Sequence, residues 1–135
     1  MDKIKREEML VPDSGHIFVS NLRFYAYHGV EEQERRVGGD YVVNLNAKVD
    51  FTKALQTDSI ADTVSYAALC DIIRKEMDIP SALLEHVAGR IAKTVEMEFP
   101  QIEELTISIN KLNPPMGVDS DGAGVVLHLI NDKTR

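Results

Sequence analysis

The segment from Asp40 to Phe51 alternates between apolar and mostly polar side chains over its whole length. Successive side chains of a β-strand point to opposite faces of a sheet, so this period of two predicts a strand with one buried and one open face. The chain must therefore fold around a sheet that carries an apolar layer on one side. The apolar parity consists of Tyr41, Val43, Leu45, Ala47, Val49 and Phe51.

Three further strands are predicted. The first runs from His16 to His28, and its apolar residues change parity near Asn21, which indicates a β-bulge or kink at that point. The other two cover Glu104 to Leu112 and Gly124 to Ile130. The loop between them contains two prolines and two glycines, which is typical of turns.

Two helices are predicted between the strand pairs. Apolar residues recur at helical spacing from Tyr66 to Asp78, and Pro80 then interrupts the pattern. Ser81 is expected to act as the N-cap of a second helix over Ala82 to Glu98.

The order β-β-α-α-β-β predicts an α+β domain, with a four-stranded antiparallel sheet and two helices on one face. The opposite face and both sheet edges then need a cover. Because Val126 and Ile130 add apolar side chains to the second parity of the last strand, we expect subunits to associate through this sheet.

Length and charge restrict the class of protein. The 135 residues correspond to one domain, expected over residues 16–135 behind an N-terminal extension at 1–15. A net charge of −7 disfavours nucleic-acid binding, and no stretch is long and apolar enough for a membrane span. The single cysteine, Cys70, and the lack of a signal peptide indicate a cytoplasmic protein.

Lys111 is a candidate acid or base. It shares the parity of Leu105, Ile107 and Ile109, so its side chain is expected on the buried side of the sheet, at the end of the strand. Desolvation there is expected to lower the pKa of its ammonium group towards neutrality. The alternative is a lysine whose stem covers apolar surface while its charge reaches water.

Glu85 lies in the first turn of the second predicted helix. A carboxylate at that place complements the helix dipole, which is the common reason for an acidic first turn. It is also a candidate for binding paired N–H donors of a ligand, because the small neighbours Ala88 and Gly89 leave space for a flat ring.

Tyr66 and Glu34 are two further candidates. Tyr66 is either a tyrosine at the edge of the core or a functional hydroxyl. Glu34 follows His28, Glu31 and Glu32, but these residues lack the spacing of a metal site, and Cys70 has no thiol partner.

Several short motifs, taken in order, resemble the dihydroneopterin aldolase family between about residues 17 and 130. They are Leu22-Arg23-Phe24-Tyr25-Ala26-Tyr27-His28-Gly29-Val30, Glu34-Arg35, Ala54 with Asp58, Asp62-Thr63-Val64-Ser65-Tyr66, Leu83-Leu84-Glu85-His86, Lys111 with Pro114-Pro115, and Gly124-Val125. Each motif alone is weak evidence for the family, but the presence of all of them in this order is a specific signal.

The resemblance implies the tunnelling fold, in which subunits join through their sheets into a barrel and two rings stack into a homo-octamer. It also implies active sites between neighbouring subunits, without a metal or another cofactor. In this family pattern Lys111, Tyr66 and Glu34 are catalytic. Substrate is bound by Glu85, Glu34, Tyr66, Val64, Ser65 and Leu84, with Tyr66 supplied by the neighbouring subunit.

The implied reaction is a retro-aldol cleavage of 7,8-dihydroneopterin, a step of tetrahydrofolate biosynthesis. The products are 6-hydroxymethyl-7,8-dihydropterin and glycolaldehyde. The imine of the dihydropterin can accept the electron pair, so neither a metal nor a Schiff base is required. We expect Lys111, with Glu34 and water, to handle protons at N5 and the 2′-hydroxyl, and Tyr66 to protonate C1′.

Two alternatives remain. The first is a dihydroneopterin triphosphate 2′-epimerase on the same scaffold, an activity that an aldolase can also have as a side reaction. The lack of a basic cluster near the expected site disfavours a triphosphate. The second is a non-catalytic pterin-binding protein, which the complete set of expected site residues disfavours.

Overall fold

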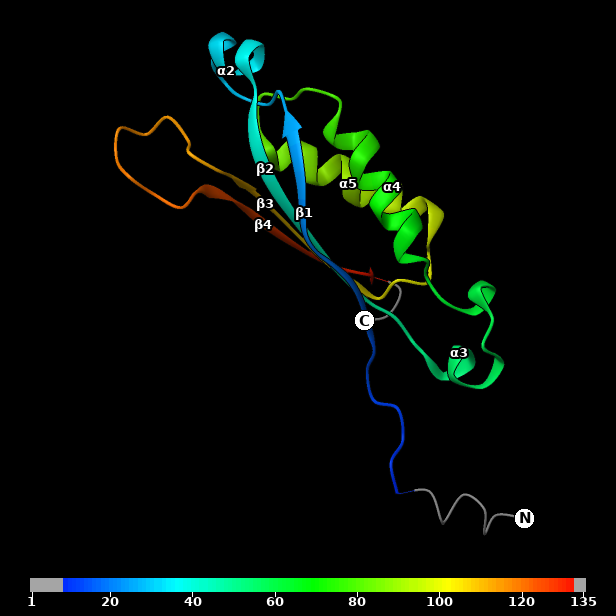
Figure 1. Cartoon of the computed structure of the whole chain (residues 1–135). Helices are drawn as coiled ribbons and strands as arrows, with labels where there is room; N and C mark the ends of the chain where they lie inside the picture. Colours follow the sequence, from blue (N-terminus) through cyan, green and yellow to red (C-terminus); the bar gives the residue numbers. More distant parts are fainter. Residues whose placement is uncertain (1–8, 133–135) are drawn as a thin grey trace, which may run out of the picture.

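The computed structural model describes residues 9–132, and part of the expected extension, residues 1–8, lies outside them. Four antiparallel strands form one sheet in the order β1-β2-β3-β4, with two long helices, α4 and α5, on one face (Figure 1). The α+β architecture expected from the sequence is thus confirmed. The elements are β1 (His16–Ala26), α2 (Glu32–Val37), β2 (Gly39–Lys48), α3 (Thr52–Thr57), the 3₁₀ helix η1 (Ile60–Asp62), α4 (Tyr66–Met77), α5 (Leu84–Glu98), β3 (Glu104–Lys111) and β4 (Ala123–Ile130).

Strand β1 contains the predicted irregularity. Val19 pairs with Leu45 and Leu22 pairs with Val43, so β1 has one residue more than β2 across this interval. Asn21 has a positive φ of 53°, and its amide donates to the Asn44 side chain at 2.7 Å. The extra residue reverses the parity that faces the helices.

The core lies between the sheet and the two long helices. It combines the apolar parity of β2 and the matching residues of β3 with the inner faces of α4 and α5. Its largest fully buried side chains include Tyr41, Leu45, Leu69, Ile73 and Ile91. The helical periodicity therefore identified the buried faces correctly.

The predicted start of the second helix is wrong. Helix α5 begins at Leu84 and has Leu83, not Ser81, at its N-cap, without a capping side chain. Ser81 lies three residues before the helix. It is buried, and its polar groups form hydrogen bonds with other parts of the chain instead of capping α5. The short helices α2, α3 and η1 were not predicted, since six residues or fewer show little periodicity.

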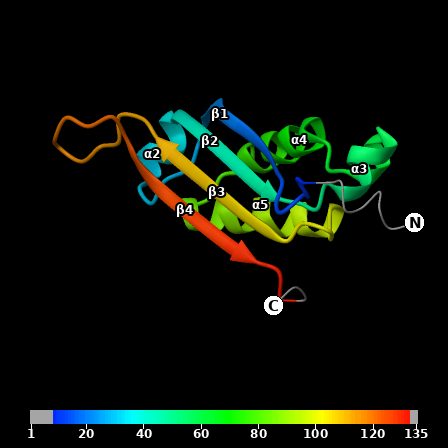
Figure 2. The ribbon, with the colours of Figure 1, turned by 90° about the horizontal axis from the view of Figure 1, so that it is seen from below.

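The face of the sheet opposite the helices is open, and within the described chain β1 and β4 are its edge strands (Figure 2). Phe18 and Tyr25 of β1 and Val126 and Ile130 of β4 are exposed, Val126 by 74%. The expected association of subunits through this sheet stays a prediction, which these exposed apolar side chains support. Among residues 9–132, no helix has the length and hydropathy to cross a bilayer.

Candidate active site

An ion pair lies at the end of β3. Nζ of Lys111 is 2.9 Å from Oε2 of Glu34, and it donates to the main-chain oxygen of His28 at 3.3 Å. The same nitrogen lies 5.6 Å from the centre of the Tyr41 ring. The two charged side chains are only 13% and 20% exposed. Strand parity thus placed Lys111 on the correct side of the sheet.

The predicted direction of the Lys111 pKa is wrong. Burial acts to lower this pKa, but the hydrogen bond from its ammonium group to Glu34 and its interactions with Tyr41 together raise it above the ordinary value. In turn, the hydrogen bond from Lys111 lowers the pKa of Glu34, as does the Glu31 amide. Both groups are therefore charged at neutral pH.

Helix α2 carries Glu34 to this position. A capping box closes its first turn, with the Glu31 amide donating to Oε1 of Glu34 at 3.2 Å. Arg35 holds the preceding segment by donating to the carbonyls of Gly29 and Val30, both at 2.8 Å. Gly29 permits a close approach here, because a Cβ at this residue would collide with the Glu34 side chain. The Glu31-x-x-Glu34 spacing was the signal from which α2 could have been predicted.

Glu85 lies in the first turn of α5 and is exposed. Among the described residues, its carboxylate has no hydrogen-bond or ion-pair partner, so it is free to accept N–H donors from a ligand. Gly89, one turn further, is also exposed and a Cβ there would meet open space. Ala88, in contrast, is fully buried, so of the two small residues only Gly89 leaves room beside Glu85.

The start of α5 and the end of β3 lie at the same end of the subunit, next to α2 (Figure 1). Glu85, Leu84, Lys111 and Glu34 thus belong to one region. The start of α4 lies at the other end, towards α3.

The remaining expected residues are at the start of α4. Val64 is buried, and the Ser65 hydroxyl caps the helix by accepting from the Ala68 amide at 3.2 Å. Tyr66 is 68% exposed. A single subunit therefore does not bring Tyr66 together with Lys111, and the structure divides the expected site residues into two groups.

His28 was not predicted as a site residue, yet it is buried beside the Lys111–Glu34 pair. Its Nδ1 accepts from the Ser81 amide at 3.1 Å, which places the proton of the neutral ring on Nε2. Burial lowers the pKa of His28, and the charges of Arg90 and Lys111 lower it further. Within residues 9–132, no three His, Cys, Asp or Glu side chains are grouped to hold a metal ion.

Residues 17–128 match the family model of dihydroneopterin aldolase. The dihydroneopterin aldolase of Staphylococcus epidermidis is 38% identical over 117 residues, which cover 86% of this chain and 97% of the relative. That of Bacillus subtilis is 38% identical over 104 residues, covering 74% and 84%.

Solved structures share the fold. The E. coli dihydroneopterin aldolase in complex with neopterin superposes with a TM-score of 0.77 at 23% identity, covering 85% of this chain and 98% of that chain. A Burkholderia dihydroneopterin aldolase bound to guanine gives a TM-score of 0.70 at 21% identity, covering 89% and 93%.

Proposed function

The chain belongs to the dihydroneopterin aldolase family, and from this premise we propose that it cleaves 7,8-dihydroneopterin into 6-hydroxymethyl-7,8-dihydropterin and glycolaldehyde. The reaction is a lyase step of tetrahydrofolate biosynthesis and takes place in the cytoplasm. The observation that carries the proposal is the Lys111–Glu34 ion pair, which lies at the same end of the subunit as the start of α5. The first turn of α5 contains Glu85, whose carboxylate has no partner among residues 9–132.

Glu85 anchors the pterin ring. A pterin presents an amino group and a ring N–H side by side, and a carboxylate can accept both in two parallel hydrogen bonds. The ligands of the two solved relatives, neopterin and guanine, share this pair of donors. Main-chain groups of Leu84 add contacts at the same helix start, where free N–H groups are available.

The second half of the site comes from a neighbouring subunit, which contributes Val64, Ser65 and Tyr66. Two features support this arrangement: the start of α4 lies away from Lys111, and Tyr66 is exposed. The open edges of β1 and β4 supply the means of association, by pairing between subunits into a ring. Two such rings form a homo-octamer.

The roles of Lys111 and Glu34 in the cleavage follow from their protonation states. The protonated Lys111 donates a hydrogen bond to N5, where electron density accumulates as the C1′–C2′ bond breaks. Glu34 orients the 2′-hydroxyl and a water molecule, which takes up the hydroxyl proton as the carbonyl of glycolaldehyde forms.

Tyr66 of the neighbouring subunit completes the reaction by protonating C1′. The electron pair of the broken bond is held by the C6=N5 imine of the substrate until that step. The proton that left the 2′-hydroxyl then passes through the water molecule to the Tyr66 phenolate, so the protons balance without an oxidant, a metal or a Schiff base. Geometry supports Tyr66 as the donor, since its exposed hydroxyl is available to an adjacent molecule.

Product analysis tests the proposal. Purified protein is incubated with 7,8-dihydroneopterin in the presence of a chelator, and glycolaldehyde and 6-hydroxymethyl-7,8-dihydropterin are quantified. We expect both products in equal amounts. Accumulation of the 2′-epimer without glycolaldehyde would assign the protein to the epimerase activity instead, and binding without any product would make it a pterin-binding protein.

A further inference from the structure

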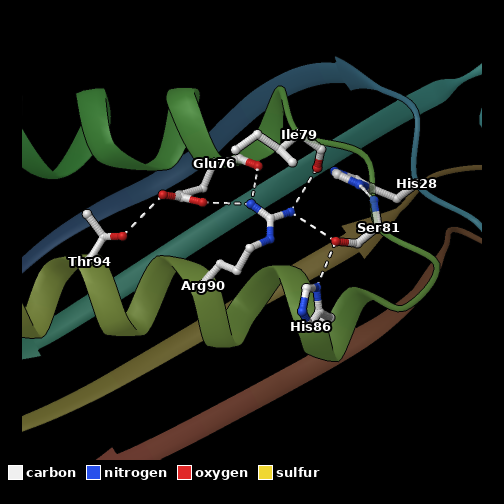
Figure 3. A network of polar contacts seen from close by, with 7 residues as sticks. All are labelled: His28, Glu76, Ile79, Ser81, His86, Arg90 and Thr94. Atoms are coloured by element: carbon white, nitrogen blue, oxygen red, sulfur yellow. Dashed lines mark hydrogen bonds and ion pairs between the residues drawn. The ribbon is translucent and has the colours of Figure 1, made fainter.

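The guanidinium group of Arg90 ties the end of α4 to the loop that leads into α5 (Figure 3). Nη1 donates to the main-chain oxygen of Glu76 at 2.9 Å and to its carboxylate at 2.6 Å, and Nη2 donates to the Ile79 carbonyl at 2.8 Å. These contacts satisfy carbonyl groups that a helix end leaves free, so stability alone explains them. Nη2 also donates to the Ser81 hydroxyl at 3.0 Å, and this bond leads towards the active site.

Ser81 fastens the α4–α5 loop to the segment that follows β1. Its amide donates to Nδ1 of His28 at 3.1 Å, and its carbonyl accepts from the Gly29 amide at 3.0 Å. Its hydroxyl, which accepts from Arg90, also lies 2.9 Å from Nδ1 of His86 (Figure 3). All the polar groups of this buried serine are therefore engaged.

The same segment holds the catalytic lysine. The main-chain oxygen of His28 accepts from Nζ of Lys111 at 3.3 Å and from the Tyr41 hydroxyl at 2.9 Å. A continuous series of hydrogen-bonded residues thus runs from Arg90 through Ser81 and His28 to Lys111.

The start of α5 follows directly on this connection, because only two residues separate Ser81 from Leu84. Its N-cap, Leu83, provides no capping side chain, although Glu85 in the first turn has to meet the substrate at a fixed distance from Lys111. We propose that Arg90 is a positioning residue of the aldolase site, which acts through Ser81 to hold Glu85 in the correct place relative to the Lys111–Glu34 pair. The proposal rests on the function proposed above.

Arg90→Lys tests the role, because lysine keeps the charge but cannot donate in the forked geometry of the guanidinium group. We expect kcat for 7,8-dihydroneopterin to fall about 10- to 100-fold, since displacement of the order of 1 Å between ring anchor and reacting groups is costly. The Kd for guanine should change little, because this ligand lacks the side chain that has to reach Lys111.

Thr94→Val is the matched control. Thr94 belongs to the same network and donates to the other carboxylate oxygen of Glu76 at 3.1 Å, but it does not contact Ser81 (Figure 3). Its loss should lower the thermal stability of the α4–α5 pair and leave kcat unchanged. A purely structural role of Arg90 predicts instead that both variants lose activity only in proportion to the folded fraction.

Ser81→Ala provides a second test that keeps the main-chain bonds to His28 and Gly29. It should lower kcat in the same direction, and the double variant Ser81→Ala/Arg90→Lys should be no worse than Arg90→Lys alone, because both changes break one connection. If Arg90→Lys does not fold, Ser81→Ala decides the question by itself.

The outcomes separate the two proposals. Wild-type kcat in a folded Arg90→Lys variant, or in Ser81→Ala, would overturn the positioning role while leaving the aldolase function in place. A wild-type protein that releases no glycolaldehyde would refute the proposed function, and the positioning role with it.

Discussion

The ammonium nitrogen of Lys111 lies 2.9 Å from the carboxylate of Glu34, and the two side chains reach this position from the end of β3 and from within α2. The ion pair raises the pKa of Lys111 and lowers that of Glu34. At neutral pH the ion pair thus holds a protonated ammonium group, which can donate, and an ionised carboxylate, which can accept, within hydrogen-bond distance of each other.

Lys111→Ala should reduce kcat by about 10²- to 10⁴-fold, the usual range for the loss of a general acid or base. Oligomer size should not change, because Lys111 ends the inner strand β3 and does not lie on the edge strands through which we propose that subunits associate. Steady-state kinetics and size-exclusion chromatography measure the two quantities. Lys48→Ala is a suitable control, since Lys48 forms an ion pair with Glu104 elsewhere on the sheet. Near-normal turnover of Lys111→Ala would disprove the role proposed for Lys111 at N5.

Glu85→Ala should weaken binding more than turnover. In the proposed site the carboxylate meets a part of the pterin ring that does not change charge in the reaction, so its loss should raise KM and lower kcat little. Because Glu85 is exposed and unpartnered among the described residues, stability should change by less than about 0.5 kcal/mol. Glu96→Ala, another exposed glutamate of α5, is the control. An unchanged KM would show that the ring binds elsewhere.

Tyr66→Phe and Lys111→Ala should each be inactive as homo-oligomers and regain activity when mixed. If each site combines Tyr66 of one subunit with Lys111 of the next, random co-assembly leaves roughly a quarter of the sites with both groups intact. Co-expression of the two variants with different affinity tags, followed by tandem purification, isolates the mixed oligomers. Their activity is then compared with that of the parent variants. Mixed oligomers as inactive as their parents would argue against a shared site.

Stability should depend on the protonation of His28. Its pKa is lowered in the folded protein, so above the ordinary value of about 6.5 the ring is neutral in both states and the stability is complete. Below about 6.5 the unfolded chain takes up a proton that the folded chain does not, and stability falls by up to about 1.4 kcal/mol per pH unit.

Urea unfolding at fixed protein concentration, between pH 7.5 and pH 5, measures this loss. His28→Gln lacks the titrating group and should show a shallower decline over the same interval. Parallel curves for the wild type and the variant would mean that His28 is protonated as readily in the folded protein as in the unfolded chain.

Gly89→Ala should separate stability from ligand affinity. Alanine is favoured over glycine in a helix by about 0.8–1.0 kcal/mol, and a Cβ at this position meets open space, so the variant should unfold at a higher urea concentration. If the ring lies over Gly89, the added methyl group raises KM for the pterin. Calorimetric titration with guanine reports the affinity directly, and an unchanged Kd would place the ring away from this turn of α5.

The sequence predicted those features that depend on neighbours in the chain. Alternation identified the strands and the buried side of Lys111, and the parity change at Asn21 located the bulge. The pKa of Lys111 was predicted in the wrong direction because its partner, Glu34, is 77 residues away and belongs to a helix too short to be recognised.

Ser81 illustrates a second limit. A serine before an apolar helix is a common N-cap, but two more residues separate Ser81 from the start of α5, and its contacts are with Arg90, His28 and His86. These partners meet because α4 packs against both α5 and β1. Local propensity carries no information about such contacts.

The extra residue of β1 decides on which side of the sheet the second half of β1 and His28 place their buried side chains. Before the bulge, Ile17 and Val19 face the helices; after it, Leu22, Phe24 and Ala26 do, and His28 continues that parity. Removal of a single residue at Asn21 would reverse the parity of β1 between this point and His28, and would direct the imidazole to the solvent face. A shortening of the chain far from the Lys111–Glu34 pair would thus withdraw the main-chain oxygen of His28 from the ammonium group of Lys111.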